Sequence, residues 1–230
     1  MFSGYILRRV NVSYSGKHKI YLDKKAIEDR HLYRLLKRIF DFITSLVGII
    51  LLLPLFLVVA GLIKIEDHGK IIYKQTRVGR NGSLFSIYKF RSMRMDADKH
   101  IAELLKYNQV EGPMFKIKDD PRITKIGKFI RKTSIDELPQ LVNVLRGQMS
   151  LVGPRPPLVT EVKQYSEYDK QRLLVIPGCT GLWQVSGRND VGFSEMVELD
   201  LEYIEKSNLL FDFFLVIKTL KIMIIPNGAY

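Results

Sequence analysis

The chain has 230 residues, 47% hydrophobic and 26% charged, a length that fits one domain and a composition that excludes a disordered chain. Its 36 Lys and Arg against 24 Asp and Glu give a formal net charge of +12, which favours anionic partners such as phosphorylated substrates, anionic lipid or nucleic acid. The single cysteine, Cys179, excludes an internal disulfide, and without a surrounding motif it is best interpreted as a small apolar residue.

The N-terminal segment, residues 1–36, is a basic extension. Ten Lys and Arg stand against three acids in residues 1–38. The segment is predicted to form a strand followed by a basic surface helix, which could bind a partner protein or lipid headgroups. We separate it from the domain that follows, residues 37–225.

The most apolar part of the chain, residues 42–63, has 22 residues without a charge. As a straight helix it would be roughly 33 Å long, enough for a bilayer core of about 30 Å. Pro54 lies near its middle, where proline removes a helical hydrogen bond. Two interpretations follow: a kinked single span, or a re-entrant membrane helix broken at Pro54 whose ends leave on one face. Basic residues on both flanks, among them Arg38 and Lys64, favour the re-entrant form, because such residues collect on the cytoplasmic side.

Residues 64–208 contain several predicted helices and one predicted β-hairpin, which together make a small α/β unit, mostly helical. A β-hairpin is predicted around Asn81-Gly82, a dipeptide that supplies the positive φ angles of a tight turn. Residues 209–225 are strongly apolar but interrupted by Asp212 and two lysines, which favours an interfacial amphipathic helix over a buried core helix. Further helices are predicted at 96–108, 122–132, 161–175 and 194–206.

Two adjacent carboxylates, Asp136 and Glu137, are the strongest candidates for chemistry. They end the run Ser134-Ile135-Asp136-Glu137, which fits a helix capping box and would then have only a structural role. Pro139 complicates that interpretation, because a proline just beyond the first turn loses a hydrogen bond. The sequence leaves open which residue is the cap.

A catalytic interpretation uses the same acids differently. Adjacent helical residues diverge by about 100°, so the two carboxylates would divide the work rather than share a proton. One could attack phosphorus as a nucleophile, and the other could hold Mg²⁺, which typically takes one or two carboxylates together with substrate phosphates. Arg131 and Lys132 would bind phosphate oxygens and offset the repulsion between a carboxylate and a diphosphate.

Five motifs follow one another along the chain: KRIFD at 37–41, YKFRSM at 88–93, the run from Asp119 to Pro156, PGCTGLWQVSGRND at 177–190 and LDLEYI at 199–204. In these motifs the chain resembles the bacterial sugar transferases, the monotopic phosphoglycosyl transferases. The resemblance covers roughly residues 37–222.

The resemblance implies a re-entrant membrane helix at 42–63, a catalytic part at 64–208 on the cytoplasmic face of the bacterial cell membrane, and an interfacial helix at 209–225. It implies transfer of a hexose-1-phosphate from a UDP-sugar to undecaprenyl phosphate, with release of UMP through a covalent aspartyl-phosphosugar. Such a reaction initiates exopolysaccharide, capsule or glycan repeat-unit synthesis. Mg²⁺ is the implied cofactor, and membrane lipid is a further partner. Binding to nucleic acid is not expected, because a nucleic-acid-binding protein would not need the membrane segment. A homodimer is expected from the apolar surface left on so small a unit.

Matched residue by residue, the resemblance makes Asp136 the nucleophile and Glu137 the Mg²⁺ ligand. The implied substrate-binding residues are Lys89, Arg91, Arg131, Arg155, Arg188 and Asp200. The Lys and Arg residues among them would hold phosphates or the nucleotide. Two departures matter: the family break often reads Ser-Pro where this chain has Leu53-Pro54, and residues 1–36 match no motif. The alternative function is a non-enzymatic, membrane-anchored basic module in which the two acids only cap a helix.

Overall fold

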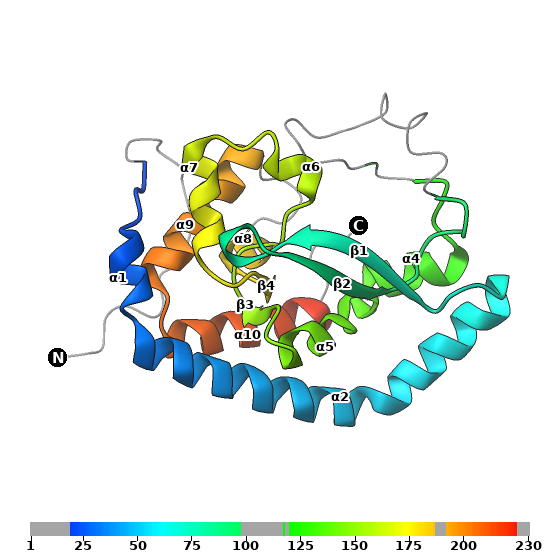
Figure 1. Ribbon diagram of the computed structural model, residues 1–230. Helices are drawn as coiled ribbons and strands as arrows, with labels where there is room; N and C mark the ends of the chain where they lie inside the picture. The colour runs from blue at the N-terminus through cyan, green and yellow to red at the C-terminus, as the bar shows by residue number, and fades with distance from the viewer. Residues whose placement is uncertain (1–18, 98–116, 118–119, 187–191, 225–230) are drawn as a thin grey trace.

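The computed structural model describes residues 19–97, 117, 120–186 and 192–224. The predicted helix at 96–108 lies almost wholly outside the described residues, and so does Arg188. Within them the protein is mostly helical, as expected, and has two small sheets (Figure 1). The elements are α1 (Lys24–Glu28), α2 (His31–Asp67), β1 (Ile72–Val78), η1 (Arg80–Gly82), β2 (Leu84–Phe90), α4 (Lys125–Lys132), η4 (Ile135–Glu137), α5 (Gln140–Leu145), β3 (Ser150–Val152), α6 (Val159–Val162), α7 (Glu167–Lys170), η5 (Gln171–Leu174), β4 (Gly178–Thr180), α8 (Leu182–Ser186), α9 (Phe193–Lys206) and α10 (Leu209–Ile224).

The longest element, α2, contains the whole apolar segment. It continues through Pro54 as one helix. Figure 1 shows it along one edge of the molecule, curving toward its C-terminal end. A proline removes one backbone hydrogen bond, which a helix can accommodate by bending. The expected break at Pro54 is therefore not present as an interruption of the helix, and the re-entrant path stays a prediction.

The N-terminal part of α2 is held to the α/β unit by charged side chains. Arg38 donates to the carbonyl of Leu145 at 2.7 Å, at the C-terminal end of α5. Asp41 accepts from the backbone N–H of Leu151 in β3 at 3.1 Å. Lys37, the other member of this basic flank, donates to Asp212 of α10. The basic flank before the apolar segment, which the sequence indicated only as a membrane border, thus binds protein.

The C-terminal end of α2 is held to the same unit. Glu66 accepts from the backbone N–H of Lys125 at 2.7 Å, at the start of α4, and Asp67 pairs with Arg91 just after β2. Both ends of α2 are therefore fixed to one folded unit. This end also joins a small apolar cluster of buried residues, Val59, Ile63, Phe90 and Ile130.

The predicted hairpin is present as β1 and β2, with Val78 opposite Leu84. Asn81 and Gly82 have φ angles of 54° and 81°, the positive values that their sequence predicted. They lie in the short 3₁₀ turn η1 rather than in a two-residue turn. The hairpin therefore formed as expected, with a longer connection.

A second, parallel sheet pairs β3 with β4 and was not predicted. Ser150 lies opposite Gly178. A Cβ at Gly178 would lie 2.1 Å from the backbone nitrogen of Gly153, so the close approach of these chain segments requires glycine there.

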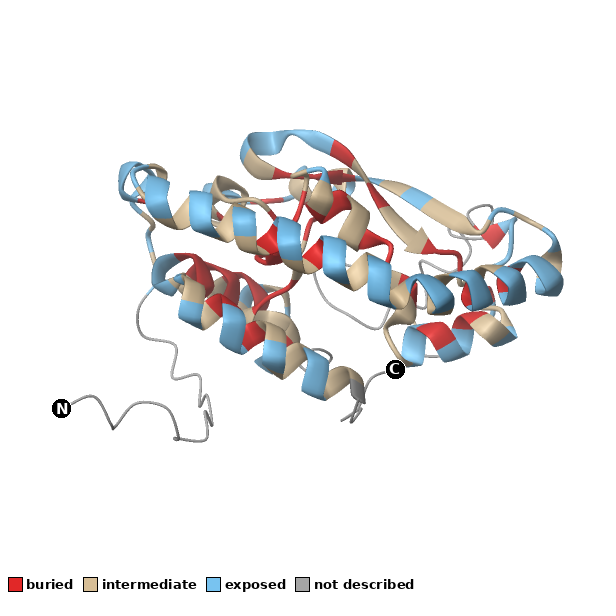
Figure 2. Ribbon diagram, turned by 90° about the horizontal axis from the view of Figure 1, so that it is seen from below, coloured by how far each residue is buried: buried red, intermediate tan, exposed pale blue. Residues whose placement is uncertain are grey.

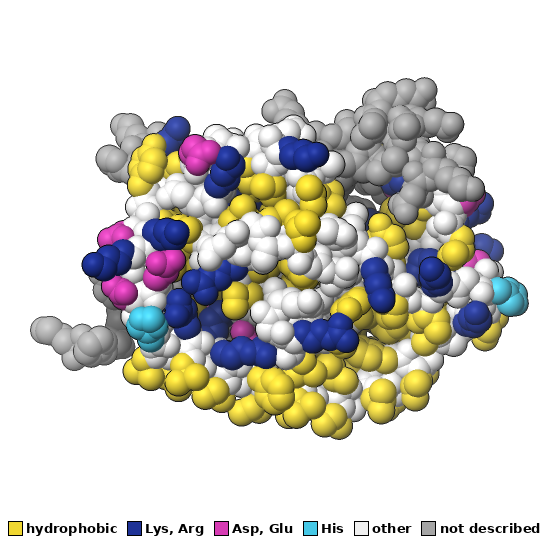
Figure 3. Space-filling view, viewed as in Figure 1, with side chains coloured by type: hydrophobic (Ala, Val, Ile, Leu, Met, Phe, Trp, Pro, Cys, Tyr) yellow, Lys and Arg dark blue, Asp and Glu magenta, His cyan; other side chains and the backbone are white. Residues whose placement is uncertain are grey.

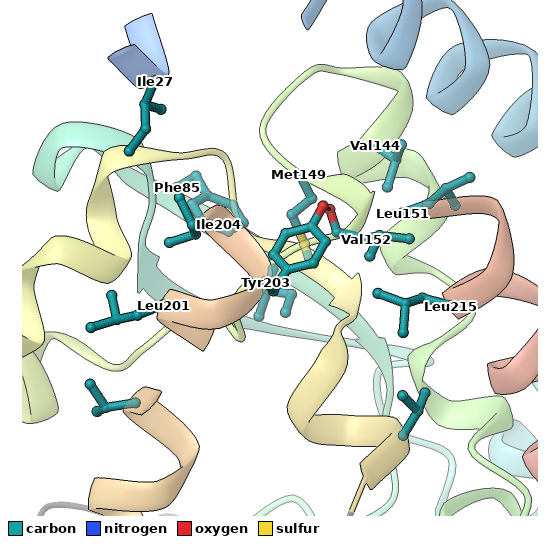
Figure 4. Packing of buried hydrophobic residues seen from close by; sticks show 13 residues of the cluster. Ile27, Phe85, Val144, Met149, Leu151, Val152, Leu201, Tyr203, Ile204 and Leu215 are labelled. Carbon is teal, nitrogen blue, oxygen red and sulfur yellow. Dashed lines mark hydrogen bonds between the residues drawn. The ribbon is translucent and has the colours of Figure 1, made fainter. Parts of the chain in front are cut away.

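The main core lies between the hairpin, β3, α9 and α10. Figure 4 shows Tyr203 of α9 among the side chains of this cluster. The Tyr203 hydroxyl oxygen lies 3.1 Å from the carbonyl oxygen of Val152 in β3. Apolar burial of this kind stabilises by about 25 cal/mol per Å². The buried members are Ile27, Phe85, Ile87, Val144, Met149, Leu151, Val152, Val185, Val197, Leu201, Tyr203, Ile204 and Leu215.

The described part of the N-terminal extension packs on this unit. The backbone N–H of Leu22 donates to Gln171 at 2.7 Å, and that of Ile20 donates to the Tyr168 hydroxyl at 3.1 Å. Ile27 of α1 is 7% exposed within the core. The extension therefore begins its contacts with the domain well before α2.

One edge of the molecule is strongly apolar. Figure 3 shows hydrophobic side chains along the edge that α2 occupies, with Lys and Arg side chains next to them, and Figure 2 shows the exposed outer residues of α2 and α10. By length and composition α2 could cross a membrane. This exposed apolar edge is that of a membrane-associated protein. The apolar residues exposed by 52–83% include Ile50, Leu51, Leu57 and Val58 of α2 and Leu210, Phe213 and Phe214 of α10.

Candidate active site

The two adjacent acids lie in η4, a single 3₁₀ turn between α4 and α5. Ser134 has a left-handed φ of 57°, and its side chain makes no capping hydrogen bond. α5 begins after Pro139 without any side-chain cap. The capping-box interpretation is therefore wrong, since neither Ser134 nor either acid caps the helix. Pro139 explains the outcome, because it fits the start of a helix but not its second turn.

Asp136 is buried, with 8% of its surface exposed. Loss of hydration, and then the negative charge of Glu137, raise its pKa from 3.8 to about 6, while Lys89 and Arg131 act in the opposite direction. A carboxylate with this pKa is more basic than an ordinary one and is still mostly ionised at neutral pH. Both properties suit a nucleophile.

Glu137 is the more accessible acid. Its carboxylate lies 2.6 Å from the Lys89 ammonium, with 44% of the Glu137 side chain exposed. Lys89 reaches it from β2, where it lies opposite Tyr73 of β1. The hairpin therefore brings a cation to the acids from a segment about fifty residues earlier in the chain.

A cavity of about 1310 Å³ brings most of the predicted residues together. Asp136 and Glu137 line it, and so do four of the predicted cations, Lys89, Arg91, Arg131 and Arg155. Lys132, which the sequence also predicted to bind phosphate, is exposed and does not line it. In the described part of the chain its lining has nine Lys and Arg against three acids, so it favours anionic ligands. These basic residues are Lys70, Lys74, Arg77, Lys89, Arg91, Arg94, Arg122, Arg131 and Arg155.

Arg91 is fixed in the cavity wall by the end of the membrane-facing helix. It is 7% exposed and pairs with Asp67, the last residue of α2. Gly69 provides the space, because a Cβ there would lie 2.2 Å from an Arg91 nitrogen. The second Arg91 nitrogen, Nη1, is buried without a hydrogen-bond partner among the described residues. That nitrogen can donate to a ligand.

Arg155 lies in the segment between β3 and α6. It pairs at 3.1 Å with Glu161, whose side chain is almost fully buried. Arg77 of β1 supports the same segment by donating to the carbonyl of Pro156 at 3.0 Å. Burial and the nearby Arg155 lower the pKa of Arg77 to about 10, so it stays charged at neutral pH. Buried charged side chains therefore hold Arg155 and the segment around it in place.

Asp200 does not line the cavity. It is fully buried in α9, where it accepts from Arg172 Nε at 2.8 Å. Arg172 in turn lies 3.4 Å from the carbonyl oxygen of Arg155, a long contact. Asp200 therefore reaches the site only through other residues, and this placement does not support direct substrate contact. Arg188 lies in a part of the chain that the structure does not describe.

The sequence reasoning missed three contributors to the site. Arg77 follows the apolar segment in the sequence as one of its basic flanking residues, but in β1 its side chain is buried. Asp67 holds Arg91, and no short-range signal indicated that pair. Trp183 also lines the cavity, and its buried indole nitrogen has no hydrogen-bond partner in the described segments.

The side chains around the cavity can be compared with those that usually bind Mg²⁺. No cluster of three or more His, Cys, Asp or Glu side chains occurs among residues 19–97, 117, 120–186 and 192–224. Mg²⁺ is commonly held by one or two carboxylates with substrate phosphates and water. Asp136 and Glu137 provide two carboxylates in a cavity that nine Lys and Arg side chains also line. The residues therefore fit an ion that is held jointly with substrate phosphates.

Comparison with known proteins finds relatives that match most or all of this chain. The chain is 48% identical over 220 residues to the galactosyl transferase CpsE of Streptococcus agalactiae, covering 94% of this chain and 48% of CpsE. It is 42% identical over 236 residues to the undecaprenyl-phosphate galactose phosphotransferase of Salmonella typhimurium, covering 100% of this chain and 49% of that protein. It is 42% identical over 198 residues to the exopolysaccharide production protein ExoY of Sinorhizobium fredii, covering 84% of this chain and 88% of ExoY.

The chain thus spans about half the length of CpsE and of the Salmonella protein, and most of the length of ExoY. The family described as bacterial sugar transferase matches residues 32–226, a range that includes the whole of α2 beyond its first turn and every site residue discussed above. This chain belongs to the bacterial sugar transferase family.

Proposed function

We propose that this protein transfers a hexose-1-phosphate from a UDP-sugar to undecaprenyl phosphate and releases UMP. The observation that carries the proposal is the shared position of Asp136, Glu137 and nine Lys and Arg side chains in one cavity. Cations around a carboxylate let it approach the phosphorus of an anionic diphosphate. Relatives named as an undecaprenyl-phosphate galactose phosphotransferase and a UDP-galactose-lipid carrier transferase support these substrates.

In the first step, a carboxylate oxygen of Asp136 bonds to the phosphorus that carries the sugar. The bond from this phosphorus to the bridging oxygen breaks, and its electron pair leaves with UMP. In the second step, a phosphate oxygen of undecaprenyl phosphate attacks the same phosphorus, and Asp136 leaves as a carboxylate. The raised pKa of Asp136 suits the first step, because it makes the carboxylate a better nucleophile.

The surrounding side chains bind and orient the phosphates. Arg91 and Arg155 are held by Asp67 and Glu161, so their guanidinium groups are placed before a ligand binds. Lys89 orients the carboxylate of Glu137, the residue that we assign to hold Mg²⁺. When bound, Mg²⁺ supplies charge neutralisation at the phosphate oxygens.

We infer that α2 enters the membrane and returns to the cytoplasmic face. Its N-terminal part is bound to β3 and α5, and its C-terminal end is bound to α4 and Arg91. A helix that crossed the bilayer would place these two ends on opposite sides, away from a common partner. A bend near Pro54 in lipid is compatible with this path, because neighbouring groups can satisfy the freed carbonyl.

The sugar is the least constrained part of the proposal. CpsE, at 48% identity, and the Salmonella relative, at 42%, are named for galactose, and a relative at 37% identity is named for UDP-glucose. We therefore propose UDP-galactose or UDP-glucose as the donor and the initiation of an exopolysaccharide or capsule as the pathway step.

The test is UMP release by purified protein with Mg²⁺ and a panel of UDP-sugars. Without acceptor lipid, UMP should appear in an amount limited by the enzyme, because the covalent step stops after one turnover. Undecaprenyl phosphate should then restart release. UMP that forms only when acceptor is present would remove the aspartyl-phosphosugar from the mechanism. If no donor gave UMP, the alternative function of a non-enzymatic basic module would be favoured. Light scattering on the same sample would separately test the expected homodimer.

A further inference from the structure

The cavity has a second, apolar part that the phosphate chemistry does not explain. On α2 its lining residues are Thr44, Gly48, Leu52 and Leu55. Their spacing of four, four and three residues places them along one face of the helix. The neighbouring Leu51 does not line the cavity and is 73% exposed on the outside of the same helix. α2 therefore has a lipid-facing side and a cavity-facing side.

α10 contributes to the lining in the same way. Its lining residues, Val216, Thr219, Leu220 and Met223, also follow helical spacing. Ile217 and Leu220 are similarly exposed, at 49% and 51%, but only Leu220 lines the cavity. Two stripes of aliphatic and small side chains thus face one space.

The inner end of this space reaches the reacting carboxylate. Cys179 and Thr180 of β4 line it together with Asp136. Thr180 and Thr219 join β4 to α10 through a hydroxyl contact of 2.7 Å. Burial raises the pKa of the Cys179 thiol well above its ordinary value, so this wall is uncharged. The lining therefore changes from aliphatic to cationic within one cavity.

We propose that the groove between the cavity-facing sides of α2 and α10 holds the first isoprene units of the acceptor lipid. We name this groove, defined by Thr44, Gly48, Leu52, Leu55, Val216, Thr219, Leu220 and Met223, the isoprenoid groove. The inference rests on the proposed function, because it assigns one part of the cavity to one of the two substrates. The lipid phosphate then lies at Asp136 while its chain continues into the bilayer.

Three observations favour this occupant. The outer sides of the same two helices carry the exposed apolar residues that face lipid, so the groove opens where such a chain would be. The groove walls carry no charge in the residues that define it, whereas a nucleotide-sugar is polar throughout. The groove walls also contain small side chains, Gly48 and the two threonines, and a Cβ at Gly48 would lie 3.4 Å from Leu141, another residue that lines the cavity.

Two matched pairs of variants test the inference in the full chain. Leu52→Trp and Leu220→Trp place a large ring in the groove, whereas Leu51→Trp and Ile217→Trp place it on the outer side of the same helices. Filling the groove should raise the KM for undecaprenyl phosphate roughly tenfold relative to the KM for UDP-sugar. The outer variants should stay within about twofold of the wild type. The inference would be overturned if the groove variants changed both KM values equally, or if all four variants changed the KM for undecaprenyl phosphate to the same extent.

A photoactivatable polyprenyl phosphate gives a readout that does not depend on turnover. With its diazirine in the first isoprene unit, crosslinking should label peptides containing residues 44–55 and 216–223. Undecaprenyl phosphate should compete, and a phospholipid of similar concentration should not. Labelling confined to outer residues, or equal competition by phospholipid, would show that the groove takes bulk lipid and would refute the inference. Loss of UMP release by the wild type would instead count against the proposed function alone.

Discussion

Two buried carboxylates in this protein have opposite surroundings. Asp212 of α10 is fully buried and receives the Lys37 ammonium at 2.9 Å and the hydroxyls of Tyr33 and Tyr203 at 2.8 and 2.6 Å. Asp136 is nearly as buried, but its main neighbours are a second acid and cations at the cavity wall, and its pKa is raised to about 6. The same side chain is thus saturated with donors in one place and left unsaturated in the other.

The difference separates a structural acid from a reactive one. Asp212 joins α10 to the start of α2, which provides Tyr33 and Lys37, and to α9, which provides Tyr203. A carboxylate already bonded to three donors is a poor nucleophile, because those bonds stabilise its charge. Asp136 lacks such a set of donors, so its carboxylate stays basic and able to react with a substrate.

Replacement of Asp136 should give the largest effect on activity. We expect Asp136→Asn to reduce UMP release by about 10⁴-fold or more, because the amide cannot act as the nucleophile. Thermal unfolding should occur at the same or a higher temperature, because a buried charge is removed. Retained turnover would place the nucleophile elsewhere.

Replacement of Asp212 should reverse that pattern. We expect Asp212→Asn to lower the free energy of unfolding by about 3–5 kcal/mol, because it leaves Lys37 with an incomplete buried pair. Denaturant unfolding in detergent would measure it. Lys206→Met, which breaks the exposed pair with Glu202, is the control and should cost less than about 1 kcal/mol. If both variants lost similar stability, Asp212 would not be a special anchor.

Asp200 should show an intermediate, indirect effect. Asp200→Asn weakens its bond with Arg172, which lies near the Arg155 carbonyl. We expect the KM for UDP-sugar to rise roughly tenfold with a smaller change in kcat, since the position of Arg155 changes and the reacting atoms do not. A loss of kcat as large as that of Asp136→Asn would instead indicate direct participation.

The pH dependence should show the raised pKa of Asp136. Its folded-state pKa of about 6 lies above the ordinary 3.8, so the protonated, unreactive form accumulates as the pH falls through about 6. UMP release should then decrease by about tenfold per pH unit on the acid side. Glu137→Gln should move this limb to lower pH in the remaining activity, because it removes a negative charge that raises the pKa. A limb that stays in place would mean that another group titrates.

Local sequence signals predicted the elements whose causes are local. Asn81-Gly82 predicted the positive φ angles of the hairpin, and charge and hydrophobicity predicted the long apolar helix and α10. The same reasoning failed at Ser134, because the capping box competes with a proline that the tertiary structure places at the helix start. The resemblance placed Asp200 among the substrate-binding residues, and the structure shows it bonded to Arg172, nearly thirty residues away.

The amino-acid sequence by itself determined the membrane-facing segment, the hairpin, the adjacent acids and the basic motifs, because each depends on neighbours or on helical spacing. Only the tertiary structure decided which charges meet. It placed Lys89 on Glu137, Asp67 on Arg91 and Lys37 on Asp212, and it put both ends of α2 on one unit. Such pairs form between distant segments, and whether a carboxylate is reactive or structural depends on how many donors the folded chain brings to it.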